Sequence, residues 1–523
     1  MARAKSPGFR QSMSALHTWT GLLPGWLLYV VFLFGTTAFF QQEISRWMRP
    51  EMSGPLSLSR VLPAADTLLR QRAAGAQEWT VSLPVRSGQV VRVTWSGGSG
   101  PVAEGKATLD PATGREIAVR DTQGGSFLYS FHYNLYAMPR QWARLAVCIA
   151  ALTMLVAILS GIVTHKKIFA DFFTLRFHKG QRSWLDSHNV TAVLALPFHL
   201  MITYTGLVAL LFTLMPWAIS ANFADRSAFF DIAYPDAPEI AATAQPRPSL
   251  PLAQLVHRAQ TVWNRAGWRG SVGGITVTNP GDANATASVY PARDQLGEPA
   301  PRLILSAANG EVLHASPPEG GPRTAQSVMI LLHLGTFADT FLRWLYFASG
   351  IMGTVMIGTG LVLWTVKRRK RLPDPARPPF GFRVVERLNI GMMLGPVAGI
   401  AVYFLANRLL PLHLAQRGER EIACLLATWG GVFAWSTLRS PARAWIEIMR
   451  ACVALYALIP LINALTTDRG LVPSLAARKW IYGGFDLVML AIAGLMAFAA
   501  ARLDARNAQL PQRRITPARR KSA

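Results

Sequence analysis

Histidines at repeated positions are the residues of this 523-residue chain best suited to chemistry. His17 and His188 each stand at the start of a long apolar stretch, whereas His132 and His333 each lie about ten residues before the next stretch. A glycine follows the first histidine of each half by 18 residues, and a tryptophan follows the second by 10 or 11. The pattern indicates a duplicated unit: histidine, apolar segment, long loop, histidine, apolar segment.

The duplication favours haem ligation by imidazole pairs. A neutral imidazole binds haem iron, and parallel repeats place shared sites where the repeats meet. We therefore expect His17 to face His188 near one membrane surface and His132 to face His333 near the other. Iron held by two imidazoles keeps no open position and suits one-electron transfer. The sequence has no CxxCH motif, so the two expected haems are non-covalent, b-type haems.

Two further histidines have no counterpart in the other half. His199 lies 11 residues after His188, about 16 Å along a helix and near mid-membrane, where ionisable residues are costly and often functional. His199 could be a ligand of the outer haem, a propionate partner or a relay. His165 could displace one member of the inner pair. The other histidines are interpreted as solvated residues: His178, His257, His314 and His413.

The composition indicates a membrane protein that positions these histidines on helices. The chain is 51% hydrophobic and only 15% charged, against about 25% charged in soluble proteins. Apolar runs of about 20 residues can cross a bilayer. Eight such runs are expected, the first of them a retained anchor: 20–41, 142–164, 190–218, 344–366, 390–411, 421–438, 446–466 and 480–501.

Basic residues cluster just outside the apolar runs, for example in KRRKR (367–371). Cytoplasmic loops carry such an excess, so the net charge of +25 reflects topology and does not indicate nucleic-acid binding. The clusters fall on one side if both termini are cytoplasmic. The three cysteines lie in apolar runs without CxxC spacing, so a disulfide or metal role is not expected.

Two long loops, 43–140 and 219–340, would lie outside the membrane. Each shows a helical stripe followed by alternating strand patterns, such as WTVSLPV (79–85) and ITVTN (275–279). We expect two small, related α+β domains. The last four spans have short connections and little polar content, and are interpreted as an appended helical module. The first half is expected to comprise the N-terminal tail with the first span (1–42) and the first outer domain (43–140). The second and third spans with a basic loop (141–218), the second outer domain (219–340) and the fourth span with a basic loop (341–389) should follow. The C-terminal helical module (390–501) and a basic tail (502–523) complete the expected organisation.

Several motifs are missing. The chain has no GxGxxG after a strand and no GxxxxGK[ST], so it has no evident nicotinamide, flavin or ATP domain. An electron donor would be a membrane quinol or a separate cytoplasmic reductase.

Several segments resemble the PepSY-associated transmembrane helix family of bacterial inner-membrane proteins. They lie within about residues 10–370 and include LHTWTGLLPGWLLYVVFLFGTTAFF (16–40), FHYNLY (131–136), GIVTHKKIFADFFTLR (161–176), SWLDSHNVTAVLALPFHLMITYTGL (183–207) and LLHLGTF (331–337). The turns LDPATG (109–114) and LSAANGEV (305–312) resemble PepSY-type domains. The family includes iron-regulated proteins and ferric-siderophore reductases that carry two b haems. The four extra C-terminal helices depart from its minimal form.

The resemblance implies a multi-pass protein of the bacterial inner membrane with two periplasmic PepSY-like domains. It implies electron transfer to a periplasmic acceptor, a ferric siderophore or its carrier, with His17, His188, His132 and His333 as iron ligands. His165 and His199 match only a subset of the family. Two alternatives stay open. The chain could be a non-catalytic regulator that binds a peptidase or envelope partner, or a transporter, a class that usually needs broken helices.

Overall fold

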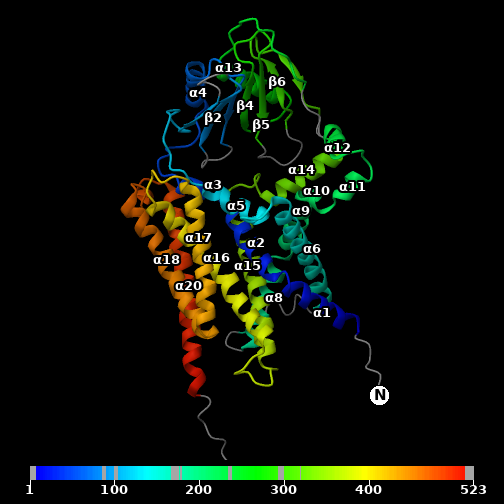
Figure 1. Ribbon diagram of the computed structural model, residues 1–523, viewed down its shortest axis with the longest axis vertical. Helices are drawn as coiled ribbons and strands as arrows, with labels where there is room; N and C mark the ends of the chain where they lie inside the picture. Colours follow the sequence, from blue (N-terminus) through cyan, green and yellow to red (C-terminus); the bar gives the residue numbers. More distant parts are fainter. Residues whose placement is uncertain are drawn as a thin grey trace, which may run out of the picture.

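A helical bundle capped at one end by a β-sheet forms the molecule (Figure 1). The computed structural model describes residues 8–84, 90–98, 104–165, 176, 180–233, 238–292, 300–317 and 320–512. His178 and the basic tail after residue 512 lie outside the described residues. Helix α1 begins and α20 ends at the bundle end remote from the sheet. We call the two ends the sheet side and the terminus side.

Long apolar helices make this a multi-pass membrane protein. Among the described residues, six helices are long and apolar enough to span a membrane. They are α6 (Arg140–Thr164), α15 (Thr340–Arg369), α16 (Phe380–Leu409), α17 (Arg417–Leu438), α18 (Pro441–Thr466) and α20 (Trp480–Gln512). Two bent helix pairs raise the number of candidate spans to eight if each pair counts as one.

The bent pairs occupy the same place in each half. Helices α1 (Phe9–Leu22) and α2 (Gly25–Ala38) meet at 61°, and α8 (Gln181–Leu194) and α9 (Leu196–Ala209) meet at 68°. Pro24 precedes α2, and Pro197 lies in the first turn of α9. Proline lacks a backbone N–H and interrupts helical hydrogen bonding. The expected spans 20–41 and 190–218 therefore correspond to bent helix pairs.

The strands of both long loops join in one antiparallel sheet. Its order is β3-β2-β1-β4-β5-β6-β7. The strands are β1 (Glu78–Ser82), β2 (Val91–Ser96), β3 (Gly105–Leu109), β4 (Val272–Thr278), β5 (Thr286–Pro291), β6 (Leu303–Ser306) and β7 (Val312–Ala315). The expected helical stripes form α4 (Leu58–Arg72) and α13 (Leu252–Arg265), and both contribute to one hydrophobic core with the strands.

The strands expected in the two α+β domains share this one sheet. Strand β1 from the first loop pairs with β4 from the second, with Val81 opposite Ile275. The hydroxyls of Thr80 and Thr276 lie 3.1 Å apart across this junction. An unpaired edge strand exposes hydrogen-bonding groups that attract other strands. Pairing β1 with β4 removes one such edge from each half.

Short helices connect the sheet to the bundle. The second histidine of each half lies on one of them, His132 on α5 (Gly124–Asn134) and His333 on α14 (Gly321–Leu334). The others are α3 (Gln41–Trp47), α10 (Leu211–Leu214), α11 (Pro216–Ser220) and α12 (Arg226–Ala233). A further short helix, α19 (Leu471–Ala476), lies between α18 and α20.

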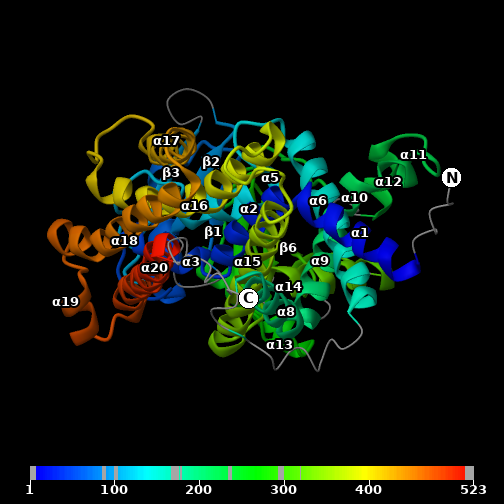
Figure 2. The same ribbon diagram turned by 90° about the horizontal axis from the view of Figure 1, so that it is seen from below.

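Helices α16 to α20, the C-terminal module, pack on one side of the bundle (Figure 2). They share a hydrophobic core with α2, α3 and α5. The expectation of little polar content in the module is wrong. Its buried polar residues include Asn407, Arg408, Arg417, Glu421, Asn463 and Asp486. The module is therefore joined to the first half of the repeat by both apolar and polar contacts.

Candidate functional site

The four repeated histidines meet in two pairs. The ring centroids of His17 on α1 and His188 on α8 are 6.1 Å apart on the terminus side. Those of His132 and His333 are 6.0 Å apart on the sheet side. Each pair takes one histidine from each half of the repeat, as the spacing predicts.

Each ring of the two pairs is oriented by a hydrogen bond of the same kind. Its Nδ1 lies 2.6 to 3.0 Å from a backbone carbonyl oxygen of a neighbouring helix. Because a carbonyl oxygen only accepts, Nδ1 carries the proton and Nε2 keeps its lone pair, the form that binds metals. The bonds are His17 to Ala157, His132 to Val31, His188 to Met356 and His333 to Ile202.

A glycine four residues after each of these carbonyls makes room for the ring. The positions are Gly161, Gly35, Gly360 and Gly206. A Cβ at Gly35 would lie 2.6 Å from the His132 ring, and a Cβ at Gly206 would lie 2.8 Å from the His333 ring. At Gly161 and Gly360 the corresponding distances are 3.1 and 3.2 Å. The carbonyl and the glycine together form a repeated seat for an imidazole.

The sheet-side pair lines a cavity of about 490 Å³, within the usual range of ligand pockets. Its wall is mostly apolar, and its charged members are Arg144, Arg343 and Glu43, of which Arg343 and Glu43 form an ion pair. Thr203, also in the wall, is buried and its hydroxyl has no hydrogen-bond partner among the described residues. Such a group is usually satisfied by a ligand or water.

The terminus-side pair lines a second cavity of about 500 Å³. It has three cationic residues in its wall, Lys367, Arg368 and Arg371. Leu28 and Met154 line both cavities and so separate them. Each cavity thus combines an apolar wall, a histidine pair and basic side chains, a composition suited to an apolar ring system with acidic substituents.

Burial keeps the sheet-side imidazoles neutral. Burial lowers the pKa of His132. Burial, together with the neighbouring His132, lowers the pKa of His333 to about 3. Both rings are therefore uncharged at neutral pH, the protonation state that a metal ligand requires.

The two unpaired candidates both line the terminus-side cavity. His199 is 1% exposed, and its Nε2 lies 3.4 Å from the Ser349 carbonyl oxygen. His165 is half-buried and follows the last residue of α6. Neither ring is a member of the His17–His188 pair. Of the remaining histidines, His257 and His413 are exposed and His314 is half-buried on the outermost strand.

The spacing of each pair fits two imidazoles that would hold one metal ion between them. A bond from a metal to an imidazole nitrogen is about 2.0 Å long, so two imidazoles that shared one metal ion would have centroids roughly 6 Å apart. Within the described residues, no three His, Cys, Asp or Glu side chains group as a metal site. Two ligands per site suit a metal whose other positions are filled by a macrocycle.

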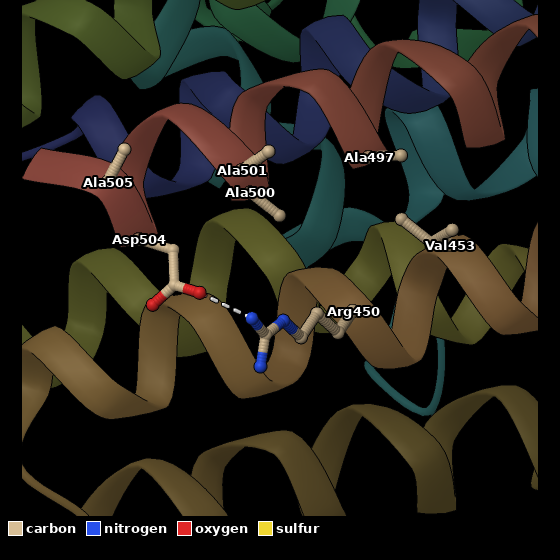
Figure 3. Close-up of a pocket in the computed structure, with 7 residues that line it drawn as sticks. All are labelled: Arg450, Val453, Ala497, Ala500, Ala501, Asp504 and Ala505. Atoms are coloured by element: carbon tan, nitrogen blue, oxygen red, sulfur yellow. Dashed lines mark hydrogen bonds and ion pairs between the residues drawn. The ribbon is translucent and has the colours of Figure 1, made fainter.

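A third cavity, of about 610 Å³, lies between α18 and α20 and contains no histidine (Figure 3). Alanines form much of its wall, and Arg450 and Asp504 pair across its edge. Both side chains of this pair are exposed. The cavity is unrelated to the imidazole sites.

Residues 14–367 match the protein family described as the PepSY-associated TM region. The chain belongs to this family. The match begins within α1, includes the rest of both bent helix pairs, the whole sheet and all four paired histidines, and ends before α16. A comparison with curated proteins found no match. The C-terminal module thus lies outside the part of the chain that defines the PepSY-associated family.

Sequence reasoning missed several residues of the site. It noted Gly35 and Gly206 as markers of the repeat but not as seats for imidazoles. It did not single out Gly161 and Gly360, although they follow the second histidines by 29 and 27 residues. That similar spacing is the signal that could have revealed them. The cavity arginines Arg144 and Arg343 also lie at similar positions, 12 and 10 residues after those histidines.

Proposed function

We propose that this protein is a di-haem electron carrier of the bacterial inner membrane that reduces a periplasmic ferric chelate. The observation that carries the proposal is the arrangement of two imidazole pairs, with centroids 6.1 and 6.0 Å apart and every Nδ1 bonded to a carbonyl. Two b-type haems, when bound, would supply reversible one-electron chemistry at the two depths.

The protein's own residues would bind and orient these groups. His17 and His188 would hold one iron, and His132 and His333 the other. Arg144 on the sheet side, and Lys367, Arg368 and Arg371 on the terminus side, would be the cations nearest to acidic substituents, whereas Arg343 is already ion-paired with Glu43. Apolar residues such as Leu28 and Met154 would exclude water between the two sites.

The basic residues also support an orientation. Lys367, Arg368 and Arg371 lie at the end of α15 or directly after it, on the side where α1 begins. By the positive-inside rule this side is cytoplasmic, which makes both termini cytoplasmic and the sheet periplasmic. Electrons would enter from a quinol or a cytoplasmic reductase and leave beneath the sheet. A ferric siderophore or its periplasmic carrier is the acceptor that the family resemblance suggests.

Anaerobic reduction of a ferric chelate tests the proposal. Protein purified after expression with ample haem should show a Soret band, and the reduced protein should be reoxidised by a ferric hydroxamate chelate. A ferrous-specific dye should report one ferrous ion per electron transferred. The His132→Ala/His333→Ala double variant is the matched control and should lose this reaction. A wild-type protein without haem would contradict the proposal.

One observation favours transport as a second candidate. Broken helices are common in secondary transporters, and the bent pairs at 61° and 68° are of this kind. In this protein the first helices of the two bent pairs carry His17 and His188, with ring centroids 6.1 Å apart. The electron-transfer proposal explains this placement directly. Haem content separates the two candidates, because a transporter of this design has no need for it.

A further inference from the structure

The C-terminal module covers only one of the two helices that carry the sheet-side histidines. Phe127, Leu128 and Phe131 of α5 belong to the hydrophobic core that the module forms. Phe131 packs against Trp429 of the module, with centroids 6.1 Å apart. No described residue of α14, which carries His333, belongs to this core. The module therefore breaks the symmetry of the two halves at α5.

Hydrogen bonds from the module hold both ends of α5. At its start, the Tyr403 hydroxyl donates to the Gly124 carbonyl oxygen at 2.9 Å, and the Thr122 hydroxyl donates to the Glu421 carboxylate. Just past its end, the Tyr136 hydroxyl donates to a Glu419 oxygen at 2.8 Å. All three module side chains come from α16 or α17.

Glu421, which accepts the hydrogen bond from Thr122, is held in place by a buried ion pair. Arg417 and Glu421 form an ion pair, and neither side chain is exposed. Glu421 also accepts a hydrogen bond from the Asn407 amide at 2.8 Å, and Arg417 donates to the Asp121 carbonyl oxygen at 3.1 Å. Buried charges are costly unless all partners are in place, so this network strongly favours one position of the chain at residues 121–122.

The position of α5 determines the position of His132. Thr122 precedes His132 by 10 residues, about 15 Å along a helix. The ring must fit against Gly35 and reach the Val31 carbonyl oxygen at 2.6 Å. Phe131 is also stacked on Phe34 of α2, with centroids 4.3 Å apart. A small shift of α5 would therefore disturb the imidazole and its hydrogen bond.

We propose that the C-terminal module is a clamp on α5 that tunes the sheet-side histidine pair, with Thr122 and Glu421 as positioning residues. The inference rests on the proposed function, because it assigns the clamp to one of the two haem sites. The clamp makes the sheet-side site, and not the terminus-side site, dependent on the module. The hydrogen bond that orients an imidazole ligand changes its basicity, so loosening α5 shifts the reduction potential of that site.

The test compares Glu421→Gln and Thr122→Val with the control Glu447→Gln. Glu447 lies in the same module but is partly exposed and accepts from Trp435 and Arg439. Redox titration should show that Glu421→Gln and Thr122→Val shift one of the two potentials. The shifted potential should be the one that disappears in His132→Ala. Hydrogen exchange of residues 120–136 should become roughly tenfold faster. The control should match the wild-type protein in both measurements.

Two results would overturn the clamp: unchanged potentials with unchanged exchange, or equal shifts at both sites, which would indicate general loosening. Thr122→Val keeps the buried ion pair intact and decides the matter if Glu421→Gln does not fold. A wild-type protein without haem would contradict the proposed function and the tuning together. The exchange measurement would still show whether the module holds α5.

Discussion

The imidazole of His132 rests directly on Gly35, where a Cβ would lie 2.6 Å from the ring. The same ring donates to the carbonyl oxygen of Val31, one helical turn earlier on α2. Helix α2 therefore provides both the space and the hydrogen-bond acceptor for the imidazole of His132, about a hundred residues later in the chain. The same seat occurs under the other three paired imidazoles.

Gly35→Ala should displace His132. The added methyl group would overlap the ring, and overpacking of this kind costs about 1–3 kcal/mol. We expect the ratio of haem to purified protein to fall toward one from two. Gly430→Ala is the control, because a Cβ there meets no atom within 4 Å. Full haem content in Gly35→Ala would show that the seat is not needed.

His199→Leu should leave the haem content unchanged. His199 lines the terminus-side cavity but is not a member of the ring pair there, and leucine is a comparably bulky apolar replacement. The pyridine haemochrome assay should still give two haems per chain. Loss of one haem would assign a ligand role to His199 and disprove the pairing of His17 with His188.

Asp110 should make the link between sheet and bundle sensitive to acid. Burial raises the pKa of Asp110, but hydrogen bonds from Ser53 and Thr113 together lower it by more. The pKa of Asp110 is therefore below the usual 3.8. A lowered pKa stabilises the fold above the unfolded-state value, and this contribution is lost as pH falls through the folded-state value. Proteolysis of residues 48–57 should therefore accelerate below about pH 4.

The Asp110→Asn variant is the control for this acid sensitivity. It removes the charge that accepts from the Ser53 amide and hydroxyl at 2.7 and 2.6 Å. Cleavage of the variant should be faster at neutral pH and should change less with acid. Parallel acid profiles for wild type and variant would show that another group is responsible.

A disulfide across the sheet should form between Thr80→Cys and Thr276→Cys. These residues are directly opposite each other in β1 and β4, where Cα atoms are about 4.5–5.5 Å apart, within reach of a disulfide. Thr80→Cys with Thr278→Cys is the control, since diagonal neighbours are about 7–8 Å apart. Equal cross-linking in both, or none in either, would indicate that the two loops do not share a sheet.

The sequence predicted those parts of the fold that depend on local pattern. Apolar length identified the spans, and strand alternation identified segments such as WTVSLPV (79–85), which overlaps most of β1. The duplicated spacing also paired His17 with His188 and His132 with His333, because equivalent residues of two packed repeats meet at their interface. These inferences need only periodicity and symmetry.

Features that depend on long-range contacts were not predictable in this way. No local pattern shows that β1 pairs with β4 across nearly 200 residues. The prolines at 24 and 197 are visible in the sequence, yet a proline alone does not give the bends of 61° and 68°. Glu421 and Arg417 lie near the start of a helix, and only their contacts with residues far away in the chain, such as Thr122 and Asp121, explain their burial.

The most direct test of the central claim, that each histidine pair holds one haem, is the number of haems bound per chain in variants of the paired histidines. The wild-type protein should bind two haems per chain. His17→Ala and His188→Ala, alone or combined, should bind one, and so should His132→Ala and His333→Ala. One variant from each pair combined should bind none. Two haems retained in any of these variants, or no haem in the wild-type protein, would contradict the account.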